Sequence, residues 1–475
     1  MRTLVWFRGK DLRVHDHAPL ADAAHAGEVV PVFVLDPFFF DPARAQTLPH
    51  RMQFLLESLV ELQASIERLG SELLLVGGRA IDRIPELAEK LAVDRVVAHR
   101  WTEPFGRTRD DIVEARLSKS KIPFQLYEGE LLRPPGTVLT GGGTPFRVFT
   151  PFARAHLKAG PPDAPVRMPR SLPPLPRGAK ALHDTSIPTL ESLGIERNPN
   201  LVPGGEKAAK KRLDRFLEDA SGYIAAREDM GSTGTSRLSQ DHKFGTLSMR
   251  TVWERASDTL GGAPLERFQL EVLWRSFHYE NLWHRPELLA SPFHPEFAGF
   301  PWREDLPSFT AWQRGETGYP LVDAASRQLL TEGFVHNRAR MIAASFVCKH
   351  LLLPYSWGEA HYMKYLTDGD WAQNNGNWQW SAGCGCDAQP YFRVFNPISQ
   401  GPKFDAAGTY VRTHVPELAK LDAKYIHSPW LAPADALARA GIQLGRTYPR
   451  PLVEHAQARV RFLDTAKRHL AKERP

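Results

Sequence analysis

Hydrophobic positions follow two different patterns along the chain, and the first pattern covers its first third. Short apolar runs alternate there with helical segments, at residues 3–7, 29–35, 73–76 and 95–98. Alternation of this kind is typical of a parallel sheet that is covered by helices on both faces. We therefore expect residues 1–130 to form an α/β domain with a Rossmann-like parallel sheet.

One helix of this domain is marked clearly by its apolar spacing. Between residues 51 and 69, apolar side chains recur at intervals of three and four, namely Leu55, Leu59, Leu62, Ile66 and Leu69. This period places them on one helix face, and Gly70 is suited to end the helix. No GxGxxG motif follows the first strand, so an ordinary dinucleotide site is not indicated here.

The second pattern begins after a connector. Prolines are concentrated between Pro161 and Pro203, which excludes long regular elements, so we read residues 131–205 as an interdomain linker. Beyond it, strand patterns almost disappear and the helical period dominates. We expect residues 206–475 to form a larger all-α domain, with helices at 206–220, 247–256, 267–283, 319–330, 338–352 and 453–472.

Charge and composition narrow the class of partner. The chain has 60 Lys and Arg against 54 Asp and Glu, a net charge of +6. This mild excess is compatible with a polyanionic partner if the positive charge is clustered. Aromatic residues make up 10% of the chain and include 12 Trp, which suits stacking surfaces as well as cores.

The cysteines and the hydropathy pattern bear on location. With only 3 Cys in 475 residues, we do not expect a framework of disulfide bonds, and this low number fits a reducing cytosol. Cys384 and Cys386 could begin a metal site, but no second pair or nearby His completes one, so we expect no metal. No apolar run is long enough to cross a membrane, and the N-terminus lacks a signal peptide. We expect a cytoplasmic protein that does not span a membrane.

Polar chemistry is densest at residues 368–397, which read DGDWAQNNGNWQWSAGCGCDAQPYFRVFNP. Asn side chains are poor helix formers that both donate and accept hydrogen bonds. Trp378 and Trp380 lie two positions apart, so they cannot share one helix face. The mixture favours a pocket for a flat ring with polar edges. The alternative is a loop–helix junction in which Trp residues fill a core and amides cap helix ends.

Two further segments offer binding chemistry. Glu271, Trp274, Arg275 and His278 lie at helical spacing on one stripe that is too polar for plain core. The segment TGTSRLS, residues 233–239, gathers hydroxyls and a guanidinium at a helix start, where a pyrophosphate could bind. An ordinary N-cap is the alternative for this segment.

The string DGD–NNGNWQWSAG–DAQPYFRVFNP resembles the flavin-binding signature of the DNA photolyase and cryptochrome family. It is most similar to the bacterial enzymes that repair cyclobutane pyrimidine dimers, and FRGKDLRVHDHAPL resembles the family's opening motif. The resemblance implies an antenna-binding α/β domain and a helical FAD-binding domain. It also implies that reduced FAD, excited by light, donates an electron to a dimer flipped out of UV-damaged DNA and so splits it.

The resemblance also implies which residues bind FAD. Arg340 is expected to pair with Asp368 beside the isoalloxazine ring, and Asn374 to face the flavin N5 atom. The TSRLS segment, preceded by Tyr223, matches the contacts to the FAD phosphates. The expected FAD contacts are Tyr223, Thr235, Ser236, Arg237, Leu238, Ser239, Glu271, Arg275, His278, Asn337, Arg340, Asp368, Asp370 and Asn374.

Lesion and DNA contacts are implied in the same way. Trp274 and Trp380 match two walls of the dimer pocket, Met341 touches the dimer, and Glu271 stabilises its radical anion through a hydrogen bond. The expected catalytic residues are Glu271, Trp274, Met341, Asn374 and Trp380. Arg338, Arg393 and Lys403 match contacts to DNA phosphates, so the expected DNA-binding residues are Trp274, Arg338, Met341, Trp380, Arg393 and Lys403.

An electron relay and an antenna complete the implied site. Trp378 and Trp302 match the first and last relay positions, but the middle position, usually Trp, is Tyr355. Either Tyr355 carries the hole, or Trp357 offers a branch, or photoreduction is slow. Trp101 and Glu103 match the loop that contacts an antenna pigment, commonly methenyltetrahydrofolate and in some members a deazaflavin.

Three rival functions stay open on the sequence. The first is a signalling cryptochrome without repair activity, which Asn374 and the retained Trp274, Trp380 and Met341 disfavour. The second is repair of the (6-4) photoproduct, whose enzymes use two His where only His336 matches here. The third is a flavin electron carrier with a protein partner. We expect the repair enzyme, acting as a monomer on damaged DNA.

Overall fold

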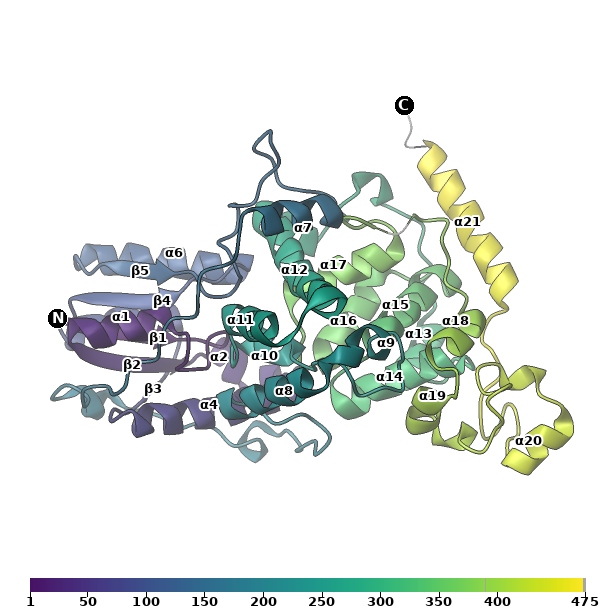
Figure 1. Ribbon diagram of the computed structural model, residues 1–475, viewed down its shortest axis with the longest axis horizontal. Coiled ribbons are helices and arrows are strands. Elements are labelled where there is room, and N and C mark those ends of the chain that lie inside the picture. Colours follow the sequence, from purple (N-terminus) through teal and green to yellow (C-terminus); the bar gives the residue numbers. More distant parts are fainter. Residues whose placement is uncertain (389, 473–475) are drawn as a thin grey trace. The chain divides into compact units, whose positions relative to one another are not determined.

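The computed structural model describes residues 1–388 and 390–472, and the chain divides into two compact units. The first unit comprises Met1–Ala220 and Ser236–Pro286, and the second comprises Ser221–Thr235 and Glu287–Pro475. Figure 1 labels most of the helices and strands of both. The limits that the sequence suggested for the domains remain a prediction.

A parallel sheet of 5 strands forms the centre of the first unit, in the order β3-β2-β1-β4-β5. The strands are β1 (Arg2–Phe7), β2 (Glu28–Leu35), β3 (Leu74–Gly77), β4 (Arg95–His99) and β5 (Phe124–Tyr127). The parallel sheet and its first four strands are confirmed. The edge strand β5 was not predicted, because it is short and only partly buried, so it lacks a strong apolar signal.

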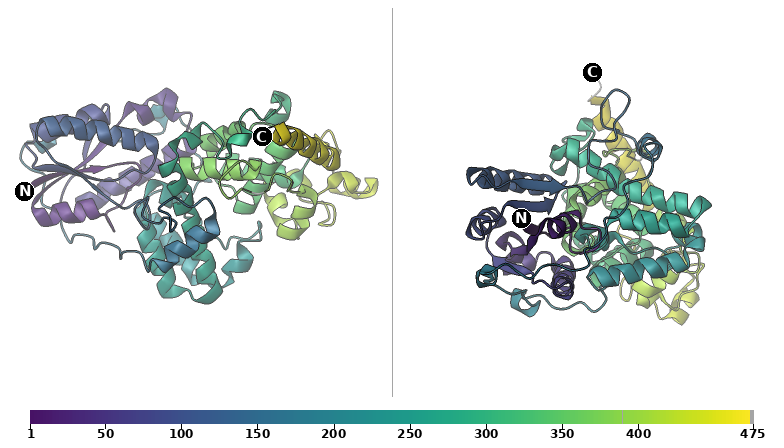
Figure 2. Two further views of the ribbon diagram at one scale, coloured as in Figure 1. Left: turned by 90° about the horizontal axis from the view of Figure 1, so that it is seen from above. Right: turned by 60° about the vertical axis from the view of Figure 1, so that its left-hand side comes forward.

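Helices cover both faces of this sheet (Figure 2). Val5 and Phe7 of β1 face a core shared with α1 (Ala18–Ala26) and α4 (Pro49–Arg68). Leu4 and Trp6 face the opposite core, which contains α5 (Ala80–Lys90) and α6 (Pro104–Lys119). The alternation follows from the period of two residues in a strand. Gly70, at φ +97°, follows the end of α4 as expected.

The remainder of the first unit consists of a connector and helices. Between Pro161 and Pro203 the structure has only two short 3-10 turns, η1 (Ala179–Leu182) and η2 (Glu191–Leu193), as the prolines predicted. The other helices of the unit are α2 (Pro37–Phe40), α3 (Pro42–Ala45), α7 (Phe149–Lys158), α8 (Glu206–Glu218), α10 (Ser239–Phe244), α11 (Met249–Thr259) and α12 (Gly262–His284). The sequence did not predict α7, which lies inside the expected linker.

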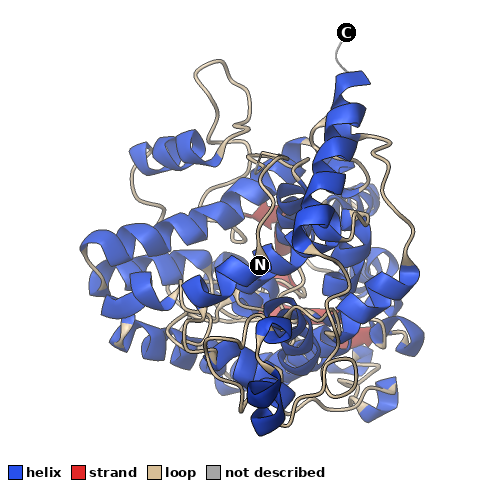
Figure 3. Cartoon of the chain, turned by 90° about the vertical axis from the view of Figure 1, so that its right-hand side faces the viewer, coloured by secondary structure: helices blue, strands red, loops and turns tan. Residues whose placement is uncertain are grey.

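The second unit consists of helices and connecting loops, with no named strand among its described residues, and Figure 3 shows how little of the chain is strand. Its helices are α9 (Tyr223–Ala226), α13 (Leu306–Arg314), α14 (Pro320–Glu332), α15 (Asn337–Ser345), α16 (Tyr355–Tyr365), α17 (Trp371–Ala382), α18 (Pro397–Phe404), α19 (Thr409–His414), α20 (Ala434–Ala440) and α21 (His455–Lys472), with a π-helical turn η6 (Phe346–His350). Short 3-10 turns connect several of them. The expected all-α character is confirmed.

The core of the second unit gathers buried rings and aliphatic side chains from α13 to α17, α19 and α21. Burial of such apolar area stabilises the unit by roughly 25 cal/mol per Å². None of the described helices combines the length and the apolar character that crossing a lipid bilayer demands.

Candidate functional site

The ion pair expected between Arg340 and Asp368 is present in the second unit. A guanidinium N–H of Arg340 donates to Asp368 Oδ2 at 2.8 Å, and Arg340 Nε–H donates to the carbonyl of Val335, also at 2.8 Å. The second oxygen of Asp368, Oδ1, is buried and accepts no hydrogen bond in the described part of the chain. A buried acceptor without a donor is costly, so this oxygen suits the N–H group of a bound ligand.

Helix α17 holds the run of amides that follows Asp370. The Asp370 side chain accepts the N–H of Gln373 and so caps the helix. Asn374 Nδ2 donates to the backbone carbonyl of Glu359 at 2.9 Å, and Asn375 Nδ2 donates to Glu359 Oε1 at 3.1 Å. Poor helix formers are thus retained inside a helix because their side chains bind buried acceptors.

Sequence reasoning missed the role of Glu359 on α16, whose carboxyl group anchors this network. Burial raises the pKa of Glu359 to about 7, although the hydrogen bond from Asn375 opposes the rise. Gln379 extends the network by donating to Asn375 Oδ1 at 3.1 Å and to the carbonyls of Leu288 and Ser291 at 3.0 Å. The available signal was a lone carboxylate in an aromatic segment, YSWGEAHYM.

In the first unit, α12 carries the four polar residues of the expected stripe. Arg267 pairs with the half-buried Glu271 at 2.5 Å, one helical turn apart. Trp274 stacks on Phe149, with ring centroids 3.7 Å apart and planes 8° apart. Phe149 begins α7, so α7 fixes the plane of this indole from one side. Neither the stack nor α7 was expected from the sequence.

The other two residues of the stripe are buried. A guanidinium N–H of Arg275 donates to the carbonyl of His242 at 3.1 Å, and the cation lies 4.8 Å from the ring centre of Tyr279. The His278 ring lies 5.7 Å from the Trp274 ring. Arg275 and His278 are therefore rigid groups that packing holds in place.

The TSRLS segment is divided between the two units. Tyr223 and Thr235 belong to the second unit, and Ser236 begins a segment of the first. Arg237 has φ +49°, a left-handed conformation that is uncommon for a residue with a side chain. Leu238 is the N-cap of α10 and Ser239 is its first residue. The backbone thus turns sharply at Arg237 just before the helix starts.

Of the expected relay residues, Trp357 alone is linked to Trp378 by a series of ring contacts in the described part of the chain. Trp378 lies 6.0 Å from Trp312, which lies 5.6 Å from Phe309, and Phe309 lies 5.3 Å from Trp357 (centroid distances). Within the described residues, neither Tyr355 nor Trp302 makes a ring contact with Trp378; Trp302 packs on Phe300 at 4.3 Å. Trp312, which is fully buried, was missed by sequence reasoning.

A tight contact holds the Trp378 indole against α16. A Cβ atom added to Gly358 would overlap the six-membered ring of Trp378. Tyr362, one turn further along α16, meets the same indole edge-on, with centroids 5.1 Å apart at 90°. The indole therefore lies in a slot between residue 358 and Tyr362, which explains its burial at 3% exposure.

The expected DNA-binding residues of the second unit are partly brought together. Arg338 and Lys403 both lie against the ring of Phe404, at 4.8 Å and 5.1 Å from its centre. Arg338 also pairs with Glu228. Met341 Sδ lies 3.9 Å from the side-chain nitrogens of Asn337 and Arg338. Two cations and a thioether thus occur in one neighbourhood.

Two aromatic or cationic groups of the second unit remain accessible. The half-exposed Trp380 makes no ring contact in the described part of the chain, so an indole face remains for a ligand. Arg393 is exposed and its guanidinium lies 5.8 Å from the ring of Phe395.

The expected antenna residues are buried beyond the end of β4. Glu103 Oε1 pairs with Lys10 Nζ at 3.0 Å and with Lys243 Nζ at 3.6 Å. The guanidinium of Arg109 lies 4.4 Å from the Trp101 ring, and the Trp101 Nε1–H is buried without an acceptor among the described residues. The carboxyl ends of neighbouring strands β1 and β4, where the strand order reverses, form the usual ligand-binding edge of such sheets.

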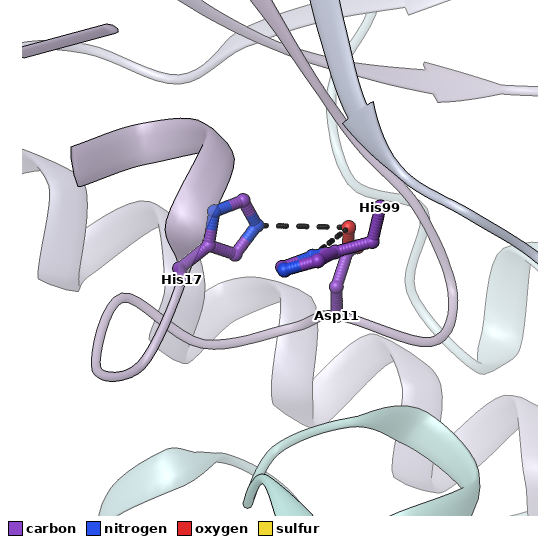
Figure 4. A group of neighbouring side chains, drawn as sticks. All are labelled: Asp11, His17 and His99. Atoms are coloured by element: carbon purple, nitrogen blue, oxygen red, sulfur yellow. Dashed lines mark hydrogen bonds and ion pairs between the residues drawn. The ribbon is translucent and has the colours of Figure 1, made fainter. Parts of the chain in front are cut away.

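One group with metal-ligand spacing occurs among the described residues, formed by Asp11, His17 and His99 (Figure 4). Asp11 Oδ2 lies 3.2 Å from His99 Nδ1 and 3.6 Å from His17 Nε2. His17 Nδ1 accepts the N–H of Leu20 at 3.1 Å, so its proton resides on Nε2 and points to Asp11. A cation would have to displace that proton, so we read the group as a polar cluster in which His99 hydrogen-bonds Asp11 and His17 lies just beyond hydrogen-bond distance.

The pKa values agree with this interpretation. Burial alone would raise the pKa of Asp11, but the neighbouring imidazoles of His17 and His99 hold this pKa below its usual range. Burial lowers the pKa of His99 to about 3. A carboxylate between two imidazoles ties the loop after β1 to the end of β4, which is a structural role.

Comparison with known proteins places these features in a family. A family model described as DNA photolyase matches residues 3–172, and one described as FAD binding domain of DNA photolyase matches residues 268–468. The deoxyribodipyrimidine photo-lyase of Agrobacterium fabrum is 41% identical over 468 residues, covering 97% of this chain and 96% of the relative.

Solved structures give the same result. A bacterial class III photolyase from Agrobacterium tumefaciens superposes with a TM-score of 0.90 at 39% identity, covering 98% of this chain and 97% of that one. A cryptochrome from Synechocystis sp. superposes with a TM-score of 0.89 at 31% identity, covering 98% and 99%. Because relatives at such identity span nearly the full length, this chain belongs to the DNA photolyase family.

Proposed function

We propose that this protein is a light-dependent deoxyribodipyrimidine photo-lyase that splits cyclobutane pyrimidine dimers in UV-damaged DNA. The observation that carries the proposal is the 41% identity to a protein of that name over 97% of the chain. The catalytic groups that we propose all lie on described helices: Glu271, Trp274, Met341, Asn374 and Trp380.

Several groups fit a buried flavin. The orphaned Oδ1 of Asp368 requires a donor, and Arg340 beside it offers cationic N–H groups. Reduced FAD supplies the electron that opens the dimer when light excites it. The residues that would hold it are Tyr223, Thr235, Ser236, Arg237, Leu238, Ser239, Glu271, Arg275, His278, Asn337, Arg340, Asp368, Asp370 and Asn374.

Asn374 would govern the proton at the flavin N5 atom. An amide has no acidic proton at neutral pH, so Asn374 can hold a hydrogen bond to N5 without protonating it. Its own Nδ2 is bound to the Glu359 carbonyl at 2.9 Å, which orients the amide.

Trp274 and Trp380 would hold the flipped-out lesion. Phe149 covers one face of Trp274, so the indole keeps a single plane on which a pyrimidine can stack, and base–aromatic stacking contributes roughly 1–3 kcal/mol per base. Glu271, fixed by Arg267, would accept or share a hydrogen bond with the dimer. Met341 would contact the dimer, and Arg338, Arg393 and Lys403 would bind backbone phosphates.

The relay and the antenna belong to the same proposal. Trp378 would supply electrons to the flavin, with Trp357 as the outer residue rather than Tyr355 and Trp302. Of these three candidates, Trp357 alone has ring contacts leading to Trp378 among the described residues. Trp101 and Glu103 would contact a second chromophore, methenyltetrahydrofolate or a deazaflavin. We also infer that the protein is a monomer and that it is cytoplasmic. The reducing cytoplasm suits the three free cysteines.

Two observations bear on the rival functions. Burial lowers the pKa of His336 to about 4, and its Nδ1 accepts the N–H of Arg338 at 3.2 Å. His336 is therefore neutral and caps α15, and it is the one His in the segment where (6-4) repair enzymes use a pair. The cryptochrome alternative shares the fold, so activity must decide between the two.

The test is a repair assay with a dark control. The purified protein should be yellow, with flavin absorption and, if the folate antenna is bound, a near-ultraviolet band. A reduced sample should remove dimers from an oligonucleotide under blue light and leave them in the dark. Dimers that persist in the light while flavin is bound would favour the cryptochrome, and a gel shift without preference for irradiated DNA would favour the electron carrier.

A further inference from the structure

The π-helical turn η6 follows α15 directly and buries five consecutive side chains, Phe346 to His350. An α-helix on the edge of a core buries only one stripe, whereas π turns are rare and often occur at functional sites. Lys349 is one of the five and is 1% exposed. A lysine is almost never buried this deeply without a partner.

The partner of Lys349 is a main-chain carbonyl. Lys349 Nζ donates to the backbone oxygen of Arg393 at 3.0 Å, and it lies 5.7 Å from the centre of the Phe462 ring. No carboxylate within the described residues pairs with it. Burial lowers the pKa of Lys349 to about 8, so its amine is retained in the core at a cost in free energy.

Arg393 lies between α17 and α18, in the stretch of residues 390–396 that leads into α18. Its N–H donates to the carbonyl of Pro390 at 2.9 Å, and Asn396 caps α18 by accepting the N–H of Ile398 at 3.0 Å. The Arg393 carbonyl is tied to the core, while the Arg393 side chain is exposed over Phe395. The hydrogen bond from Lys349 therefore sets the main-chain position from which the guanidinium extends.

We propose that Lys349 is a positioning residue for DNA binding, because it holds the main chain at Arg393 so that the guanidinium reaches a phosphate. The inference rests on the proposed function, since Arg393 needs a fixed position only if the chain binds DNA. It explains why the core retains an amine that an apolar side chain of the same length could replace. An apolar side chain at position 349 would fill the same volume and lose only the hydrogen bond to the Arg393 carbonyl.

The hydrogen bond from Lys349 to the Arg393 carbonyl is tested by limited trypsin digestion of the full FAD-bound chain. Lys349→Met keeps the aliphatic stem, so we expect unchanged flavin content but cleavage after Arg393 about tenfold faster, as a locally released segment opens more often. Lys424→Met is the matched control, because Lys424 lies 5.3 Å from the Tyr425 ring and is exposed. Cleavage after Arg393 at the wild-type rate in Lys349→Met would overturn the proposal.

The consequence for DNA is tested with a double-mutant cycle on a UV-irradiated duplex. Lys349→Met and Arg393→Gln should each lower the slope of log K against log salt by about 1, as the loss of one phosphate contact does. The double variant should match Arg393→Gln alone. Additive losses would overturn the positioning role.

The same assay separates this inference from the proposed function. If Arg393→Gln leaves the slope unchanged while light-driven repair proceeds, Lys349 does not act through a phosphate contact, and the repair function stands. If the wild-type protein neither prefers irradiated DNA nor repairs it, the proposed function fails and the inference fails with it.

Discussion

A carboxyl group lies directly behind the amide proposed to face the flavin. Glu359 gives its backbone carbonyl to Asn374 and its side chain to Asn375, and burial raises its pKa to about 7. An acid with this pKa changes its charge near neutral pH, unlike an exposed glutamate. The surroundings of Asn374 therefore change with pH even though Asn374 itself does not titrate.

We expect this group to make stability depend on pH. Burial raises the pKa of Glu359 from 4.5 to about 7 on folding, so between these values the folded chain binds the proton more tightly. The free energy of unfolding then falls as pH rises through this window, by up to about 3 kcal/mol. Glu359→Gln should remove this contribution, which denaturant unfolding from about pH 5 to about pH 8 would reveal. Parallel curves for both proteins would contradict it.

The Arg340–Asp368 pair should control flavin retention. Asp368→Asn leaves Arg340 without its carboxylate, and losing a charged hydrogen bond costs about 1–3 kcal/mol, or about fivefold to 150-fold in the Kd for FAD. Flavin released on dilution, measured by fluorescence, checks this. Asp435→Asn breaks the exposed pair with Arg439 and should change nothing. Equal flavin retention in both variants would exclude the proposed role of Asp368.

At the scale of elements, α13, α16 and α17 surround one indole. Trp378 of α17 contacts Tyr362 of α16 and Trp312 of α13, and Trp312 leads through Phe309 to Trp357. The Tyr expected at the middle relay position, Tyr355, therefore does not isolate Trp378. An alternative set of rings lies within the same unit.

Photoreduction of oxidised flavin should depend on this second route. Trp357→Phe should slow it several-fold, and Trp312→Phe should have the same effect, whereas Tyr355→Phe should change it little. Flavin absorbance under blue light with an external reductant gives the rate. Repair by flavin that is already chemically reduced should be equal in all three variants. A large effect of Tyr355→Phe would contradict this prediction and indicate that electrons reach Trp378 through Tyr355.

The stack between α7 and α12 should matter for the lesion and not for intact DNA. Phe149→Leu keeps an apolar side chain but loses the flat face against Trp274, which is worth roughly 0.5–1.5 kcal/mol. We expect weaker binding of a dimer-containing duplex by about threefold to tenfold, with unchanged binding of the intact duplex. Phe149→Tyr keeps a flat ring against Trp274, so this variant should bind the dimer-containing duplex as tightly as the wild type does. A loss that affects both duplexes equally would indicate general disruption.

At the scale of the whole molecule, the net charge of +6 is too small to explain DNA binding unless it is local. Arg338 and Lys403 around Phe404 form one such local group. Arg338→Gln and Lys403→Gln should each lower the salt slope of DNA binding by about 1. Lys420→Gln, an exposed lysine with no assigned role, should leave the slope unchanged. Equal slopes for the wild type and all three variants would indicate that Arg338 and Lys403 do not contact DNA phosphates.

Much of this organisation could be predicted from the sequence. The sheet, the helical remainder and the Arg340–Asp368 pair follow from apolar periodicity and from a family signature. The sequence did not predict the contacts between residues that are far apart in the chain, namely Phe149 on Trp274 and Trp312 beside Trp378. Sequence spacing carries no information about them, because tertiary packing alone brings such rings together. Helix propensity also failed for Asn374 and Asn375, since buried acceptors outweighed it.

The slot at Gly358 has a consequence for the evolution of the chain. Because any added carbon at position 358 would overlap the Trp378 ring, the two positions cannot drift separately. Across natural sequences that keep an indole at 378, position 358 should remain glycine, and a larger residue there should appear only where the indole has given way to a smaller group. A survey of aligned relatives would reveal that correlated substitution without any purified protein.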